Sequence, residues 1–131
     1  MKETICDFKV KDIMILGGSR IGLYTAELLE KEYRVTLVEK DKEKCEVIAG
    51  QLNKTLVINM DGHDVQLLEE EGLTDMDAII SVTADSEMNI MSSLVGKKYG
   101  IKKTIARIEN FDYIHLSQSI GVDTLINKKI I

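Results

Sequence analysis

The sequence lacks the features of a secreted, zinc-binding or membrane-spanning protein. It has only two cysteines, Cys6 and Cys45, whose wide spacing implies neither a disulfide framework nor a zinc cluster. The longest apolar runs, such as Ile13 to Leu16, are far shorter than the ~20 residues that cross a bilayer. Charged residues at positions 2, 3 and 7 interrupt any apolar signal-peptide core. We therefore expect a soluble, cytoplasmic domain.

Positive charge is also scarce. The chain has 17 Lys and Arg against 22 Asp and Glu, a formal charge of −5, and no Lys/Arg-rich stripe. This composition disfavours a nucleic-acid partner held by phosphate neutralisation. A length of 131 residues fits one domain and leaves little room for a separate substrate domain. Proline is absent, which is consistent with short, regular connections.

Six short, β-branched segments alternate with longer stretches of helical spacing. The expected strands are Ile13 to Leu16, Arg34 to Glu39, Thr55 to Asn59, Asp77 to Val82, Thr104 to Ile108 and Asp123 to Ile126. Near-continuous apolar strands are typical of a parallel sheet covered on both faces. We expect an α/β fold over residues 12–131: a Rossmann-like, doubly wound sheet of about six strands in the order 3-2-1-4-5-6. Residues 1–11 are polar and aperiodic, and we expect a linker or disordered tail.

Glycines mark the ends of three predicted helices and the turn after the first strand. Gly72, Gly100 and Gly121 each follow a helical stretch as a C-terminal stop. The turn after the first strand is Gly17-Gly18-Ser19-Arg20-Ile21-Gly22. The dinucleotide-binding fingerprint places glycine at the first, third and sixth positions of this loop, so Gly17 and Gly22 match and Ser19 departs.

The loop predicts a phosphate site because a helix begins directly after it. A helix N-terminus offers unpaired N–H groups and the positive end of a dipole, which favour an anion. Ser19 either holds a phosphate slightly further out or donates a hydrogen bond to it. The alternative is a tight turn with a structural role only.

An acidic residue stands where the fingerprint expects one. Glu39 ends the second strand, about 20 residues after Gly17, and a carboxylate there accepts hydrogen bonds from ribose hydroxyls. Such a carboxylate repels a 2′-phosphate, which favours NAD or an adenosine nucleotide over NADP, although Lys40 and Lys42 soften that preference. The alternative for Glu39 is a solvated strand end.

Other candidate residues follow later strands. Asp61 and Gly62 belong either to the adenine–ribose side of the site or to a turn in which Asp61 caps the next helix. Thr83, Ala84 and Asp85 face the glycine loop across the crevice expected between the first and fourth strands, and Asp85 or Ser86 also fits a helix N-cap.

Two further polar residues, Arg107 and Asn89, each have two interpretations, and the two histidines have no predicted role. Arg107, inside an apolar strand, either reaches a phosphate or an acidic loop or pairs within the structure. Asn89 either binds the loop after the first strand or is a solvated helix residue. His63 and His115 lie far apart, and we predict neither a metal site nor a catalytic dyad or triad. The chain is therefore not expected to be an enzyme.

The ordered combination of these segments resembles a known family. The segments are Ile15 to Gly22, Val38 to Asp41, Asp61-Gly62, Thr83 to Ile90 and Ile105 to Arg107. Together they are similar to the N-terminal lobe of the RCK/KTN domain, over roughly residues 12–131, and within that family to the regulatory subunits of Trk-type bacterial potassium uptake. The polar start of the chain resembles the linker before the second of two such lobes.

The resemblance implies a cytoplasmic regulatory domain, peripheral to the inner face of the cell membrane. It implies binding of NAD or NADH, or alternatively ATP, ADP or AMP, with a change of shape that gates potassium transport. The implied partners are a membrane potassium channel or transporter subunit of the TrkH type and further copies of the chain in a homo-oligomer. Two alternatives stay open: the cofactor-binding half of an NAD-dependent oxidoreductase, and a degenerate lobe that binds nothing and serves assembly.

Overall fold

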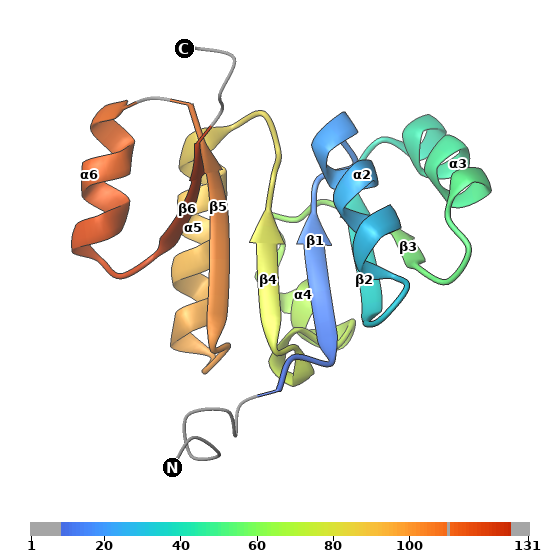
Figure 1. The fold of residues 1–131 in the computed structure, drawn as a ribbon, viewed down its shortest axis with the longest axis horizontal. Coiled ribbons are helices and arrows are strands. Elements are labelled where there is room, and N and C mark those ends of the chain that lie inside the picture. The colour runs from blue at the N-terminus through green and yellow to red at the C-terminus, as the bar shows by residue number, and fades with distance from the viewer. Residues whose placement is uncertain (1–8, 110, 127–131) are drawn as a thin grey trace.

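Six parallel strands form one sheet in the order β3-β2-β1-β4-β5-β6 in the computed structural model, which describes residues 9–109 and 111–126 (Figure 1). The strands are β1 (Asp12–Leu16), β2 (Arg34–Glu39), β3 (Leu56–Asn59), β4 (Ala78–Ser81), β5 (Lys103–Ile108) and β6 (Asp123–Ile126). Each neighbouring pair is parallel. The predicted Rossmann-like, doubly wound sheet is confirmed. Residues 1–8 of the predicted tail and residues 127–131 lie outside the described residues.

Helices connect the strands and cover both faces of the sheet. They are α2 (Arg20–Leu29), α3 (Lys42–Gln51), α4 (Val65–Glu70), α5 (Ser86–Lys98) and α6 (Phe111–Ser119). In Figure 1, α2 and α3 lie in front of the sheet on the right, while α4 and α5 lie behind it. Within the described residues, no helix has the length and apolarity needed to cross a bilayer.

Glycine ends the helices where the sequence predicts. Gly72, Gly100 and Gly121 have φ angles of +100°, +86° and +82°, the left-handed region that glycine enters without steric cost. After Gly72 the chain makes a short 3₁₀ turn, η1 (Leu73–Asp75), that the sequence pattern does not predict. Its Leu73 is fully buried, so the turn closes one end of the core.

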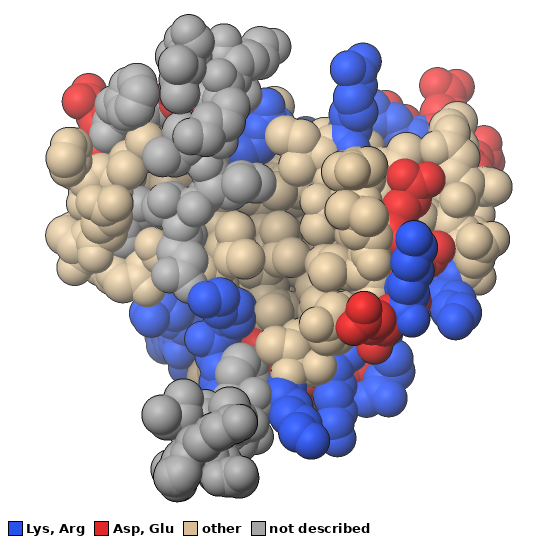
Figure 2. Space-filling view, viewed as in Figure 1, with Lys and Arg blue, Asp and Glu red and all other residues tan. Residues whose placement is uncertain are grey.

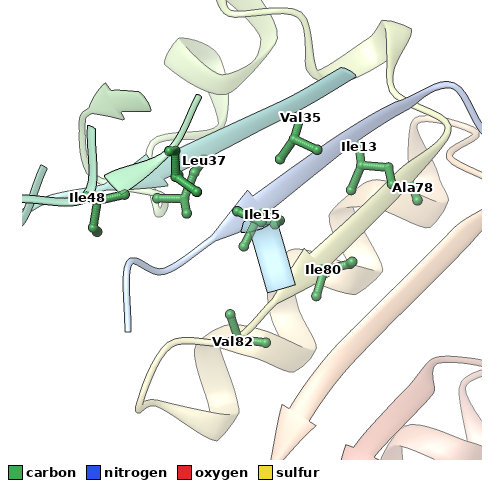
Figure 3. Close-up of a cluster of buried hydrophobic side chains, with 10 residues drawn as sticks. Ile13, Ile15, Val35, Leu37, Ile48, Ala78, Ile80 and Val82 are labelled. Carbon is green, nitrogen blue, oxygen red and sulfur yellow. The ribbon is translucent and has the colours of Figure 1, made fainter. Parts of the chain in front are cut away.

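The core has two sides because successive strand residues point to opposite faces of the sheet. Ile13 and Ile15 of β1 pack with β2, β4 and Ile48 of α3 on the front face (Figure 3). Met14 and Leu16 pack on the back face with Leu68 of α4. All of these side chains are buried, which explains why β1 is apolar at consecutive positions rather than alternating.

Parallel strands bring their carboxyl ends to one edge of the sheet, uppermost in Figure 1. The loops that follow β1, β2, β3 and β4 therefore converge at that edge, around the point where strand order reverses between β1 and β4. Figure 2 shows many of the Lys and Arg side chains along the lower part of the molecule, where the strands begin. The converging loops are thus far from that basic edge.

Candidate nucleotide site

The converging loops enclose a cavity of about 270 Å³ at the carboxyl edge of the sheet. Ten residues predicted as site residues line it: Gly17, Gly18, Ser19, Glu39, Lys40, Asp61, Gly62, Thr83, Ala84 and Asp85. Six further residues line it that were not among the predicted site residues: Leu16, Val38, Lys44, Met60, His63 and Met88. The four predicted loop segments are therefore brought together by the fold into one cavity.

Close backbone approach requires glycine at two positions of the loop after β1. Gly17 has a φ of +114°, and a Cβ there would lie 3.0 Å from the backbone N of Thr83. A Cβ at Gly22 would lie 2.0 Å from the carbonyl oxygen of Gly17, so any larger residue would clash. The first and last fingerprint glycines thus serve the tight turn and the close helix packing that the sequence predicts.

Ser19 is the N-cap of α2 and not a free hydroxyl. Its Oγ accepts a hydrogen bond from the N–H of Gly22 at 3.2 Å and donates one to the carbonyl oxygen of Val82 at 3.1 Å. Because a hydroxyl has one proton, the hydrogen bond to Val82 competes with any that Ser19 would donate to a phosphate. The N–H groups of Arg20 and Ile21, in the first turn, have no acceptor within the helix.

Glu39 joins the second strand to the glycine loop. Its Oε1 accepts from the N–H of Gly18 at 2.7 Å, and its Oε2 accepts from the N–H of Asp41 at 2.8 Å. The residue is only 8% exposed, so the interpretation of Glu39 as a solvated strand end is wrong. Each carboxylate oxygen keeps a second lone pair, which leaves acceptor capacity for ribose hydroxyls at the cavity wall.

A buried thiol and a side-chain amide donate hydrogen bonds to the backbone at the end of β2. The Sγ of Cys45, on α3, donates to the carbonyl oxygen of Glu39 at 3.2 Å, and burial raises the pKa of this thiol. The side-chain amide of Asn59 donates to the carbonyl oxygens of Glu39 and Lys40 at 3.0 and 2.9 Å. Hydrogen bonds from α3 and β3 therefore fix the backbone that carries the Glu39 carboxylate.

The loop after β3 forms a local turn around Asp61. Its Oδ1 accepts from the backbone N–H of His63 at 2.9 Å and lies 2.9 Å from the ring Nδ1 of His63. The hydrogen bond from the His63 backbone, and then the one from its ring, lower the pKa of Asp61. The cap of α4 is Asp64, which accepts from the N–H of Leu67, so the interpretation of Asp61 as that cap is wrong.

The loop after β4 forms the wall opposite the glycine loop. Asp85 is the N-cap of α5 and accepts from the N–H of Met88 at 3.2 Å, as one of the two interpretations predicts. Asn89 is fully buried and bonds to Thr83 and to the carbonyl oxygen of Arg107. Both interpretations of Asn89 are therefore wrong, because it binds neither the loop after β1 nor solvent.

Four predicted site residues lie outside the cavity lining. Arg20, Ile21 and Gly22 belong to the first turn of α2, behind the loop. Arg107 pairs with Glu109, at 2.6 Å between Nη2 and Oε2, and its Nε is buried without a hydrogen-bond partner among the described residues. Glu109 directly follows the end of β5, so this ion pair fits both the acidic-loop interpretation and pairing within the structure.

The residues that sequence reasoning missed lie next to predicted segments. Lys44 is in the first turn of α3 after Glu39, His63 follows Asp61-Gly62, and Met88 is in the first turn of α5. Their positions shortly after the strand ends, in a loop for His63 and in first helical turns for Lys44 and Met88, are the signal that the sequence offers. Lys44 adds a cationic side chain to the lining, and Met88 an apolar one. Among the described residues, no group of three or more His, Cys, Asp or Glu could hold a metal ion.

Known sequences match nearly the whole chain. The family model described as TrkA-N domain matches residues 13–128. A Trk system potassium uptake protein of Methanosarcina mazei is 39% identical over 119 residues, which are 89% of this chain and 29% of that protein. The TrkA protein of Haemophilus influenzae is 38% identical over 117 residues, 89% of this chain and 26% of that protein. The chain thus spans less than a third of these relatives, which are named as transport proteins rather than enzymes.

Solved structures share the fold. The TrkA-N domain of the Escherichia coli inner membrane protein ybaL superposes with a TM-score of 0.77 at 11% identity, over 92% of this chain and 90% of that one. An AMP-bound Kef C-terminal domain of Shewanella denitrificans gives 0.74 at 17% identity, over 89% and 72%. The GsuK channel bound to NAD gives 0.69 at 15% identity, over 91% and 22%.

Proposed function

The chain belongs to the TrkA-N domain family, and from that membership we propose that it is the nucleotide-sensing domain of a potassium uptake system. In this proposal it binds an adenine-containing nucleotide in the cavity at the carboxyl edge and regulates transport without catalysing a reaction. The observation that carries the proposal is the position of Glu39, buried at the cavity wall and bonded to the N–H of Gly18 in the glycine loop. This is the acid-and-glycine arrangement that dinucleotide-binding folds use for ribose and pyrophosphate.

We propose NAD or NADH as the ligand, with ATP, ADP or AMP as the alternative. Both kinds are supported by fold neighbours, since the GsuK channel is named as bound to NAD and the Kef domain as bound to AMP. The adenosine ribose would lie at Glu39, the phosphates at the N-terminus of α2, and the remainder of a dinucleotide along Thr83 to Asp85. Lys40 and Lys44 would lie near the adenosine end.

Regulation follows if two conformations of the domain bind the nucleotide with different affinity, because only a difference in affinity can shift their populations. We propose that the loops at residues 17–22, 61–64 and 83–87 carry this difference. The partners would be a membrane potassium channel or transporter subunit of the TrkH type and further copies of the chain. The domain would then work at the cytoplasmic face of the membrane, as one nucleotide lobe of a longer subunit.

Calorimetric titration of the purified domain with NADH, NAD, ATP, ADP, AMP and NADPH tests the proposal. We expect saturable binding of NADH or an adenine nucleotide, and weaker binding of NADPH because its 2′-phosphate meets the carboxylate of Glu39. A Glu39→Ala variant should bind NADH or the adenine nucleotide more weakly. The difference in affinity between NADH and NADPH should also become smaller.

Other outcomes would support other functions. Absence of binding by a demonstrably folded domain would favour a lobe that serves assembly, in which the Ser19 cap has closed the phosphate site. Turnover of a bound dinucleotide by a longer form of the protein would favour the cofactor half of an oxidoreductase.

A further inference from the structure

The wall of the cavity formed by Thr83, Ala84 and Asp85 is held by one buried side chain that does not line the cavity. Asn89 lies in the first turn of α5 and is 0% exposed. Its Oδ1 accepts from the backbone N–H of Thr83 at 3.1 Å and from the Thr83 hydroxyl at 2.7 Å. Its Nδ2 donates to the carbonyl oxygen of Thr83 at 3.0 Å. One amide therefore fixes three polar groups of one residue in the wall.

The same amide ties the wall to the end of β5. The Nδ2 of Asn89 also donates to the carbonyl oxygen of Arg107 at 2.8 Å. With two donated and two accepted hydrogen bonds, the side chain uses both N–H groups and both carbonyl lone pairs. Nearby, the Oγ of Ser86 accepts from the N–H of Glu109 at 3.1 Å. The start of α5 is therefore bonded to Arg107 near the end of β5 and to Glu109 just after it.

Thr83 in turn touches the glycine loop. A Cβ built on Gly17 would lie only 3.0 Å from the Thr83 backbone N, so the two backbones are in close contact there. From the other side, the Oγ of Ser19 donates to the carbonyl oxygen of Val82. Ser19 of the glycine loop thus bonds to the residue just before the wall, and Asn89 of α5 bonds to Thr83 within it. Movement of Thr83 would change its distance from Gly17.

We propose that Asn89 is a positioning residue of the nucleotide cavity: without touching the ligand, it sets the separation between the 83–85 wall and the glycine loop. This inference rests on the proposed function. In the proposed binding mode a dinucleotide would span the crevice between β1 and β4 and contact both walls. AMP would be held only by the Glu39 side and the N-terminus of α2. Asn89 therefore determines affinity for the half of a dinucleotide beyond its pyrophosphate.

The test is the affinity of an Asn89→Ala variant for NADH and for AMP, measured by calorimetry. We expect NADH affinity to fall about tenfold or more, and AMP affinity by less than about threefold, because the wall touches only the larger ligand. Ser93→Ala is the matched control. Ser93 lies one turn further along α5, is also 0% exposed, and has an Oγ without a hydrogen-bond partner among the described residues. It should leave both affinities unchanged.

An equal loss for NADH and AMP in Asn89→Ala, or no loss, would overturn the inference, since a merely structural role predicts no change in their ratio. If Asn89→Ala fails to fold, Asn89→Ser supplies the same comparison with a polar side chain retained.

Hydrogen exchange on the ligand-free protein separates this inference from the proposed function. The N–H of Gly17 donates to the carbonyl oxygen of Val38 at 2.9 Å, and that of Met60 to the carbonyl oxygen of Glu39 at 3.1 Å. Asn89→Ala should accelerate exchange at Thr83 and Gly17 relative to Met60, whereas Ser93→Ala should not. If the wild-type protein binds no nucleotide but the two variants show this exchange pattern, the proposed function fails and Asn89 remains the residue that positions the wall. Unchanged exchange at Gly17 would defeat the positioning role itself.

Discussion

The backbone N–H of Gly18 donates a hydrogen bond of 2.7 Å to Oε1 of Glu39, and the two residues form one unit of the cavity wall. A Cβ at Gly18 would lie 3.0 Å from the same oxygen and 2.5 Å from Cδ1 of Ile48. The second glycine of the loop therefore admits the carboxylate and the α3 side chain beneath it. The acid and the glycine loop, 21 positions apart in the chain, cannot be altered independently.

Replacement of Glu39 by glutamine should lower the stability of the domain. The carboxylate accepts from two backbone N–H groups, of Gly18 and Asp41, and a glutamine amide would turn an N–H group toward one of them. We expect Glu39→Gln to lower the free energy of unfolding by about 1–3 kcal/mol, as for a buried donor left unsatisfied. Urea denaturation measures the loss, with the exposed Glu46→Gln on α3 as control. An unchanged midpoint would mean that these two hydrogen bonds contribute nothing.

Gly22→Ala should be among the most damaging substitutions in the domain. Its Cβ would lie 2.0 Å from the carbonyl oxygen of Gly17, so α2 would have to move away from the loop. We expect a loss of more than about 3 kcal/mol, or failure to fold, as for severe overpacking. Gly50→Ala is the control, because that glycine is exposed in α3 with nothing within 4 Å of its Cβ position. There alanine should stabilise the helix by about 0.5–1 kcal/mol. Thermal unfolding of both variants checks this contrast.

Two substitutions of Ser19 distinguish its role as a helix cap from the steric effect of its side chain on a bound phosphate. Ser19→Ala removes the acceptor for the N–H of Gly22 and the donor to Val82, and should cost about 1 kcal/mol. Ser19→Gly restores glycine at the third position of the fingerprint and, because glycine is a tolerated N-cap, should cost only a few tenths of a kcal/mol. If the serine side chain limits phosphate approach, Ser19→Gly should bind NADH more tightly than Ser19→Ala in calorimetric titration. Equal affinities of the two variants would show that the Cβ at this position does not limit phosphate approach.

Stability should fall in acid because of Glu30. Burial alone would raise the pKa of this carboxyl, but hydrogen bonds from the N–H groups of Asn53, Lys54 and Thr55 and from the Thr55 hydroxyl lower it to about 2. The group is ionised in the folded state at a pH where it is protonated in the unfolded chain. Its contribution is therefore fully present above the ordinary pKa of about 4.5 and is lost as the pH falls toward about 2.

The comparison of Glu30→Gln with wild type by urea denaturation at several pH values measures this contribution. The difference in unfolding free energy should be constant above about pH 5 and shrink as the pH approaches 2. Glu32→Gln, an exposed residue just after α2, serves as the control. A difference that does not depend on pH would exclude Glu30 as the titrating group.

The fold and most of the cavity could be predicted because their signals are local. Consecutive apolar residues such as Ile13 to Leu16 indicate a strand buried on both faces, and the spacing from Gly17 to Glu39 is set by one strand–helix–strand unit. Gly72 and Gly100 end helices through their own backbone freedom. Each of these inferences needs only a short stretch of sequence and a general property of residues.

The side-chain partners could not be predicted because they depend on distances across the fold. Asn89, on α5, donates a hydrogen bond to the carbonyl oxygen of Arg107, which is 18 positions away on β5. Arg107 itself pairs with Glu109, and the two-residue spacing along an extended chain was a usable signal for that ion pair. Glu30 had no such signal, since its four hydrogen bonds come from the connection between α3 and β3.

The central place of β1 has a consequence for how the chain folds during synthesis. β1 pairs with β2 on one side and with β4 on the other, and Leu16 lies opposite Ser81. A ribosome that adds ~5–20 residues per second releases β4 several seconds after β1. Until then one edge of β1, whose side chains are apolar on both faces, has no partner. Over this interval the nascent chain exposes an unpaired strand edge and apolar side chains, the features through which folding intermediates associate with other chains.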